Sequence, residues 1–180
     1  MVETCKGEEK KDIEAIMAVF KNQSVPGAPH KLLERLEGSW NTRFEVWMGP
    51  GRAPVEGMGA CEQKMILGGR YLLQEYRSKV GGEPYSGMNI LGYDNVTKRY
   101  VSAWMNTMDT GIYLFEGTTA TQDNSIVQEC RHEDPVRGPM FWRTVTRIID
   151  DTLIEFEMYW TPKVGNEEKV LGITLTRTSH

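Results

Sequence analysis

His132 is the residue whose type and position in this 180-residue chain best fit acid–base chemistry. It lies near the end of a predicted strand at about 126–133, and the alternation of side chains along a strand turns it inward. An inward histidine could act as a general base, ligate a haem iron or donate a hydrogen bond to a ligand. The alternative is a histidine bonded to neighbouring polar groups. His30, in a connector, and His180, at the chain end, are expected to be solvated.

Other catalytic and metal-binding chemistries have no supporting motif in the sequence. Cys5, Cys61 and Cys130 are odd in number and widely spaced, so they predict neither a disulfide framework nor a zinc site. No Gly-x-Ser-x-Gly nucleophile elbow occurs, and the Gly68-Gly69-Arg70 run is not followed by the helix that a phosphate-binding loop needs. We therefore predict no metal site, and no cofactor apart from haem as a remaining alternative.

Charge and hydrophobicity limit the partners. The formal net charge is −4 and no long basic run occurs, which disfavours a nucleic-acid partner. No stretch approaches the roughly 18 apolar residues of a membrane span. The charged segment 1–11 lacks the apolar centre of a secretory signal. These features predict a cytoplasmic protein with neither nucleic acid nor a membrane as its partner; a homodimer is left open.

The chain divides into a short helical part and a long strand-rich part. Residues 10–21 carry an apolar stripe at helical spacing, formed by Ile13, Ile16, Met17 and Phe20. We expect this helix to pack on the body of the domain, with a partner-binding helix as the alternative. A Pro- and Gly-rich connector follows at 22–29. The predicted division is therefore a helix and connector over 1–29 and a barrel domain over 30–180, with a further short helix at 30–37.

Ten short runs rich in β-branched and aromatic residues follow Gly38, separated by turn residues such as Gly81-Gly82 and Asp150-Asp151. The predicted strands are 39–48, 57–66, 69–80, 84–92, 99–106, 111–117, 126–133, 139–149, 153–161 and 168–177. Ten antiparallel strands in sequence order form an up-and-down meander, and closing the meander removes its exposed edges. We predict an all-β, closed antiparallel barrel of about ten strands; a two-sheet sandwich is the main alternative.

Charged residues fix the inner face of most strands, because they should face water. The opposite face then mixes aromatic and thioether side chains with neutral polar groups. Polar groups along an apolar interior are typical of a ligand cavity, although they can also satisfy one another or bind water. The predicted ligand-binding residues are Gln74, Tyr76, Tyr100, Trp104, Asn106, His132, Trp142, Phe156, Met158 and Trp160.

Two separated motifs resemble the lipocalin and calycin pattern. Gly38-Ser39-Trp40 opens the first predicted strand, and Arg177 ends the last one. The resemblance implies that Trp40 packs at the closed end of a barrel under the guanidinium of Arg177, a structural role for both.

A longer set of motifs resembles a widespread bacterial family labelled a domain of unknown function. The motifs are Ile66-Leu67-Gly68-Gly69-Arg70-Tyr71-Leu72, Gly92-Tyr93-Asp94-Asn95, Tyr100-Val101-Ser102-Ala103-Trp104, Thr110-Gly111-Ile112 and Phe156-Glu157-Met158-Tyr159. The resemblance spans about 32–178 and implies a calycin-like barrel without assigned catalytic residues. More distantly, nitrobindin-like barrels bind haem through a histidine, but their glycine-rich first strand is replaced here by Asn41-Thr42-Arg43-Phe44.

The sequence therefore favours binding of a small, largely apolar molecule inside the barrel. The first alternative is an isomerase, cyclase or lyase with His132 as base and Tyr76 or Tyr100 as acid. A haem-binding barrel is a further alternative.

Overall fold

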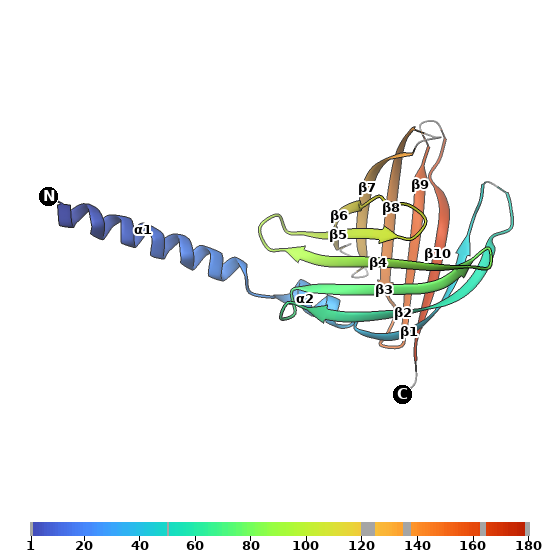
Figure 1. Ribbon diagram of the computed structural model, residues 1–180, viewed down its shortest axis with the longest axis horizontal. Coiled ribbons are helices and arrows are strands. Elements are labelled where there is room, and N and C mark those ends of the chain that lie inside the picture. Colours follow the sequence, from blue (N-terminus) through green and yellow to red (C-terminus); the bar gives the residue numbers. More distant parts are fainter. Residues whose placement is uncertain (1, 50, 120–124, 135–137, 163–164, 179–180) are drawn as a thin grey trace.

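The computed structural model describes residues 2–49, 51–119, 125–134, 138–162 and 165–178 (Figure 1). It contains two helices and ten strands. The helices are α1 (Val2–Gln23) and α2 (Ala28–Glu34). The strands are β1 (Gly38–Val46), β2 (Val55–Ile66), β3 (Tyr71–Val80), β4 (Glu83–Asp94), β5 (Arg99–Asn106), β6 (Tyr113–Thr119), β7 (Ile126–Asp134), β8 (Gly138–Ile148), β9 (Leu153–Thr161) and β10 (Glu168–Arg177).

The strands form one closed antiparallel barrel in which each strand pairs with its neighbours in sequence and β10 pairs with β1. In Figure 1, β2–β5 run across the view while β7–β10 run up it, so the sheet coils on itself as it closes. The closed up-and-down barrel predicted from the sequence is confirmed, and the two-sheet sandwich is excluded. The turn between β3 and β4 shows why the meander forms: Gly81 and Gly82 both have positive φ, as a two-residue hairpin requires.

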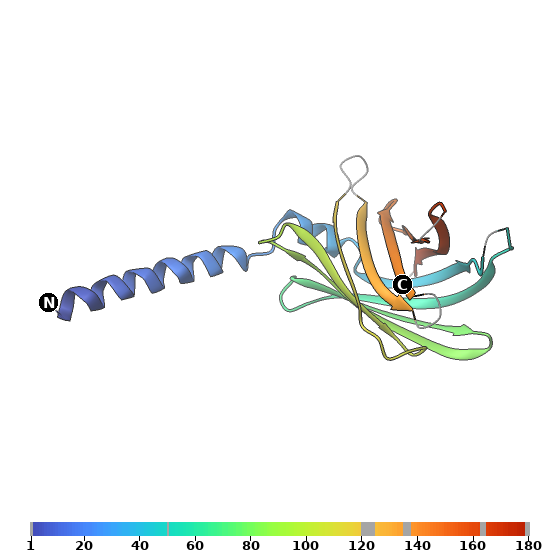
Figure 2. The ribbon, with the colours of Figure 1, turned by 90° about the horizontal axis from the view of Figure 1, so that it is seen from above.

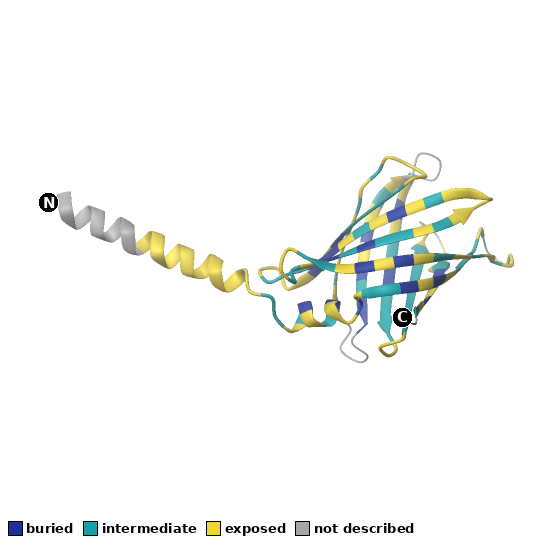
Figure 3. Cartoon of the chain, turned by 60° about the horizontal axis from the view of Figure 1, so that its bottom comes forward, coloured by how far each residue is buried: buried dark blue, intermediate teal, exposed yellow. Residues whose placement is uncertain are grey.

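Buried and exposed residues alternate along the strands, as Figure 3 shows in dark blue and yellow. This alternation follows from the period of two along a strand. One end of the barrel holds the main core, which consists of Leu33, Leu36, Trp40, Cys61, Leu72, Leu91, Tyr100, Ile126, Ile154 and Leu175.

Helix α2 closes that end of the barrel. Its buried Leu33 and the following Leu36 join the core beneath the strands. The indole Nε1 of Trp40 donates a hydrogen bond to the Leu36 carbonyl at 3.0 Å, which ties the end of the helix to the first strand. The floor of the barrel is therefore made by a helix that precedes the sheet in the chain.

Arg177 fastens this floor from the outside. Its guanidinium lies 4.1 Å from the centre of the Trp40 ring and donates hydrogen bonds to the carbonyls of Arg35, Glu37 and Asp151. Gly38 has φ +134°, and a Cβ there would lie 2.2 Å from Arg177 Nη1. The Gly-x-Trp motif and the C-terminal arginine thus form one unit, in which glycine leaves the space that the guanidinium occupies.

The packing predicted for the N-terminal helix is wrong. Helix α1 extends away from the barrel in two perpendicular views (Figures 1 and 2). The side chains of its apolar stripe, from Ile13 to Phe20, are each more than half exposed. The physical reason is that α2 already fills the closed end of the barrel. The end of α1 and the residues just after it are held by hydrogen bonds from Asn95 Nδ2 to the carbonyls of Gln23 and Val25.

The expectation of a solvated His30 is also wrong, whereas His180 lies outside the described residues. His30 belongs to α2 and is only 3% exposed. Its Nδ1 accepts a hydrogen bond from the Gly27 N–H at 3.0 Å, and its ring meets Tyr93 edge-on. Burial lowers the pKa of His30, with a smaller lowering from Arg70, while a hydrogen bond with the Tyr93 backbone acts in the opposite direction.

We predict that Arg177→Met lowers the free energy of unfolding by roughly 2 kcal/mol. The substitution removes the hydrogen bonds to three carbonyls and the cation–π contact with the Trp40 ring. Urea unfolding followed by tryptophan fluorescence measures this difference. Arg99→Met is the control, since Arg99 makes only an exposed ion pair with Glu116 at 3.5 Å and should cost less than about 0.5 kcal/mol. Equal losses in the two variants would contradict the role given to Arg177.

We predict that His30 makes the protein less stable in mild acid. Because its pKa is lower in the folded chain than the unfolded value of about 6.5, the unfolded state binds the proton first. Its contribution is therefore complete above about pH 6.5 and is lost as the pH falls toward the folded pKa. The difference in unfolding free energy between wild type and His30→Gln should shrink over this range. A difference that stays constant between about pH 7.5 and about pH 5, a range that spans the unfolded pKa, would exclude this effect.

Candidate ligand-binding cavity

The barrel encloses a cavity of about 920 Å³ whose floor is Leu36 and whose walls come from most of the strands. Aromatic and thioether side chains dominate the walls, and neutral polar groups interrupt them. Its opening lies at the end away from α2, where Met48, Val80 and Met108 belong to the lining. A ten-stranded barrel leaves such a space because its interior is wider than the eight-stranded barrels that side chains can fill.

Seven of the ten predicted ligand-binding residues line this cavity. They are Gln74, Tyr76, Trp104, Trp142, Phe156, Met158 and Trp160. Tyr100, Asn106 and His132 are not among the lining residues. Strand alternation placed the first seven on the wall, but it carries no information on the height of a residue along the barrel, and the other three lie at the two ends.

Tyr100 and Asn106 lie at opposite ends of strand β5 and make structural contacts there. The Tyr100 ring is buried at the floor, edge-on to Tyr93 with ring centres 5.0 Å apart, and its hydroxyl donates to the Pro29 carbonyl at 3.4 Å. The Asn106 Oδ1 accepts a hydrogen bond from the Met108 N–H at 2.8 Å and shapes the turn toward β6. Both side chains thus have structural partners in place of a ligand.

His132 lies at the junction of β6 and β7. Among the described residues, the paired positions of these strands run from Thr119 and Ile126 to Glu116 and Glu129, and His132 lies beyond them. The His132 ring packs edge-on against Tyr113 with ring centres 4.6 Å apart. The Tyr113 hydroxyl in turn donates to Asp109 at 2.6 Å. The acid–base pairs predicted between His132 and Tyr76 or Tyr100 are therefore not brought together at the cavity.

A row of amide side chains crosses the cavity wall on three neighbouring strands. Gln63, Gln74 and Asn89 occupy paired positions on β2, β3 and β4. The Gln74 amide donates to Gln63 Oε1 at 2.7 Å, and the Asn89 amide donates to Gln74 Oε1 at 2.8 Å. Each buried amide thereby satisfies the next, which is how polar groups become tolerable in an apolar wall.

The row begins beside Cys61 and ends in an acceptor. Burial raises the pKa of the Cys61 thiol to about 12, although hydrogen bonds from Tyr76 and Gln63 lower it, so the thiol is neutral. From Gln63 onward, the oxygen of each amide accepts from the amide N–H of the next residue, as far as Asn89. The Oδ1 of Asn89 is buried and has no hydrogen-bond partner.

Sequence reasoning missed Asn89, because the middle of its strand has no charged residue to fix the inner face. The pairing of residues across the β3–β4 hairpin could have revealed its position. Val80 faces Glu83 across the Gly81-Gly82 turn, and six residues further along each strand Gln74 faces Asn89. Counting from the turn would have placed Asn89 beside Gln74.

A glycine gives Trp104 its place in the wall. Gly87 of β4 faces Tyr76 on one side, and a Cβ added to it would lie 2.3 Å from the Trp104 ring. The indole therefore lies over the β4 backbone and meets the Tyr76 ring edge-on with centres 5.6 Å apart. These two rings form one flank of the amide row.

The opposite wall has a second polar group whose members satisfy one another. Ser102 donates to Gln128 Oε1, Gln128 Nε2 donates to the Phe115 carbonyl, and Thr144 donates to the Gln128 carbonyl. All four residues line the cavity. This side of the interior therefore offers a ligand mostly apolar contact.

The interior carries no charge among the described residues except at the margin of the lining, where Arg77, Glu168 and Lys169 lie. Lys169 Nζ contacts Glu157 at 2.7 Å, and Arg147 and Tyr159 bind the same carboxylate. Burial raises the pKa of Glu157, but the hydrogen bonds from Lys169, Arg147 and Tyr159 lower it to about 2. Lys169 is thus already paired with a carboxylate.

The described lining lacks the histidine that the haem alternative requires. Within the part of the chain that the structure describes, no histidine lines the cavity, and no three His, Cys, Asp or Glu side chains are grouped to hold a metal ion. Axial ligation by a histidine, as in nitrobindin-like barrels, therefore lacks its ligand.

Neither described helix is long and apolar enough to cross a bilayer.

A closed ring of ten antiparallel strands, plugged by a helix at one end and open at the other, defines an up-and-down β-barrel with an apolar cavity. The chain belongs to the family described as "Protein of unknown function (DUF1579)", whose sequence model matches residues 25–177. Helix α1 lies outside the matched region.

One solved structure with a similar fold is described as the crystal structure of Rv2717c from M. tuberculosis. It is 16% identical, with a TM-score of 0.60, and the match covers 86% of this chain and 100% of that one. At this identity the likeness shows the fold alone. Comparison with the curated proteins gave no match.

We predict that Gln74→Leu lowers the free energy of unfolding by roughly 2–4 kcal/mol, because it leaves Gln63 Oε1 and Asn89 Nδ2 buried without partners. Replacing the whole row by Gln63→Met, Gln74→Leu and Asn89→Leu removes the orphaned groups. The triple variant should therefore be more stable than the single one in urea unfolding. A triple variant that is less stable than Gln74→Leu would contradict the hydrogen-bonded row.

Proposed function

We propose that this protein binds a small, neutral and largely apolar molecule in the interior of the barrel. The observation that carries the proposal is the cavity of about 920 Å³, walled by aromatic and thioether side chains and open at one end. Its volume lies within the range of about 300–1,000 Å³ that is usual for small-molecule sites. A barrel filled for stability alone would pack this space with side chains.

The electrostatics support a neutral ligand. A buried charge needs a partner of opposite sign, and among the described residues the lining carries charged groups, Glu168 included, only at its margin. Lys169 is engaged by Glu157, and Arg77 is exposed. Asn89 contributes the one described wall oxygen that is buried without a partner, so a hydroxyl or amide N–H on the ligand would find an acceptor there after a small side-chain rotation.

The two alternatives have no comparable observation in their favour. An isomerase, cyclase or lyase needs an acid–base residue in contact with the substrate, and His132 packs against Tyr113 outside the lining. The haem-binding alternative rests on an axial histidine, and no described histidine lines the cavity. We therefore rank ligand binding above both.

We predict that N-phenyl-1-naphthylamine, a neutral apolar dye that fluoresces in apolar surroundings, binds the protein with a Kd of about micromolar order, a typical affinity for burial of such a molecule. Ser78→Trp should weaken binding by about tenfold or more, because Ser78 lines the cavity and a large ring there takes the dye's space. Lys79→Trp is the matched control, since the next residue on β3 faces outward and is exposed.

Fluorescence titration measures both affinities, and circular dichroism verifies that each variant keeps its strand content. A wild type that does not bind the dye would contradict the proposal. Equal weakening by Ser78→Trp and Lys79→Trp would place the dye outside the cavity.

A further inference from the structure

Exposed apolar side chains lie at the opening of the cavity, on three of the connections between strands. Met48 follows β1, Val80 ends β3 and Met108 follows β5; all three line the cavity and also face solvent. Met48 is 66% exposed and Met108 is 71% exposed. Val55 and Ile112, exposed on the same loops, add to this group. We call these five residues the mouth ring.

The mouth ring is continuous with the apolar wall. Met48, Val80 and Met108 belong to both the ring and the wall, so apolar side chains lead from the outside toward Leu36 at the floor. Its members lie on three separate connections, between β1 and β2, β3 and β4, and β5 and β6. Projecting apolar side chains of this kind fit a soft apolar phase, into which each can insert.

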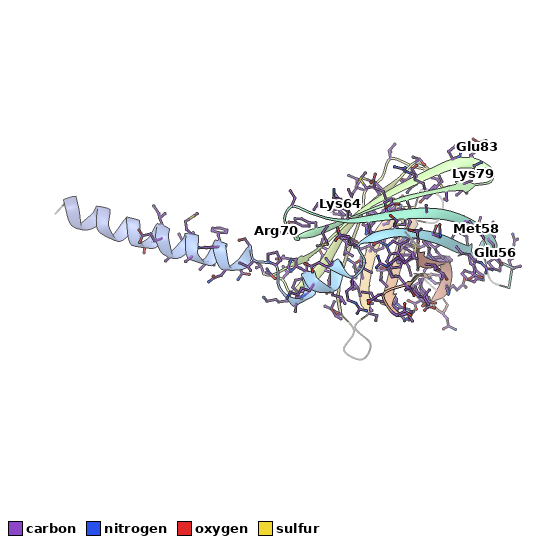
Figure 4. All side chains as sticks on the ribbon, turned by 90° about the horizontal axis from the view of Figure 1, so that it is seen from below. Glu56, Met58, Lys64, Arg70, Lys79 and Glu83 are labelled. Atoms are coloured by element: carbon purple, nitrogen blue, oxygen red, sulfur yellow. The ribbon has the colours of Figure 1, made fainter. Side chains whose placement is uncertain are left out.

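The described charges around the mouth ring have no positive excess. Lys79 and Arg52 are exposed cations, and Glu83, Asp109, Glu133 and Glu167 are exposed carboxylates at the same end. Figure 4 shows Lys79 and Glu83 near one another at the far end of the barrel from Lys64 and Arg70. A surface without net positive charge gains little from anionic headgroups. Apolar insertion, and not charge, is therefore the available source of affinity.

We propose that the mouth ring docks on a lipid surface with zwitterionic headgroups, so that an apolar ligand passes between the bilayer and the cavity without crossing water. The docking is peripheral and reversible, because few side chains insert. The route of ligand entry rests on the proposed function, whereas the docking itself is independent of it.

The test measures sedimentation of the full chain with phosphatidylcholine vesicles. We expect the wild type to bind, and Met48→Asp with Met108→Asp to weaken binding by about tenfold or more, since two inserted side chains become charged. Met58→Asp is the matched control, because Met58 is 78% exposed but belongs to the outer wall of β2 and not to the cavity lining. Phe20→Asp controls for the exposed stripe of α1. Both controls should bind as the wild type does.

Three results would overturn the proposal. A wild type that stays in solution with the vesicles excludes lipid docking and leaves a protein partner as the occupant of the ring. Loss of binding in Phe20→Asp, with the mouth variant unaffected, assigns the contact to α1. Binding that requires phosphatidylserine or disappears in 0.5 M salt (where the screening length is only about 4 Å) shows that charge is the cause.

The kinetics of transfer test the entry route. At fixed dye, the rate at which N-phenyl-1-naphthylamine passes from vesicles to the protein should rise in proportion to vesicle concentration. A rate independent of vesicle concentration would show passage through water and contradict direct transfer. If the dye does not bind at all, the proposed function fails while the sedimentation result still decides the docking.

Discussion

Closure of the β-ladder between β1 and β10 is the constraint on which the rest of this structure depends. Ten strands joined edge to edge leave an interior wider than inward side chains can fill, so one end must be plugged and the remaining space stays open. Helix α2 supplies the plug through Leu33 and Leu36, and Arg177 holds it by binding the Glu37 carbonyl while its guanidinium lies over the Trp40 ring. The cavity is thus a consequence of strand number together with a floor at one end only.

The polar groups of the interior follow from the same geometry. Because paired strands place residues of equal height side by side, amides on β2, β3 and β4 can satisfy one another along a row. The row costs little while it is complete, and it leaves its open end, Asn89 Oδ1, beside an apolar space. Two parts of the interior therefore have different roles. The amide row specifies the register of the strands, and the aromatic wall remains available to a neutral ligand.

Most of the fold could be predicted from the sequence, because charged residues mark the outer face of a strand and glycine or aspartate pairs mark its turns. The same reasoning placed Gln74 and Trp104 on the cavity wall. It misplaced His132 and Tyr100, because alternation gives the face of a residue but not its height along the barrel. It also failed for α1, since helical spacing shows an apolar stripe but not whether any surface remains free to receive it.

Native mass spectrometry of the protein purified from cells, without detergent or organic solvent, tests the cavity's role most directly. We predict a native mass that exceeds the mass of the 20.5 kDa chain by that of a small molecule. The excess should disappear when the protein is denatured, and the released compound should be neutral and mostly apolar. A native mass equal to the chain mass in repeated preparations, or a released compound that is strongly anionic, would contradict it.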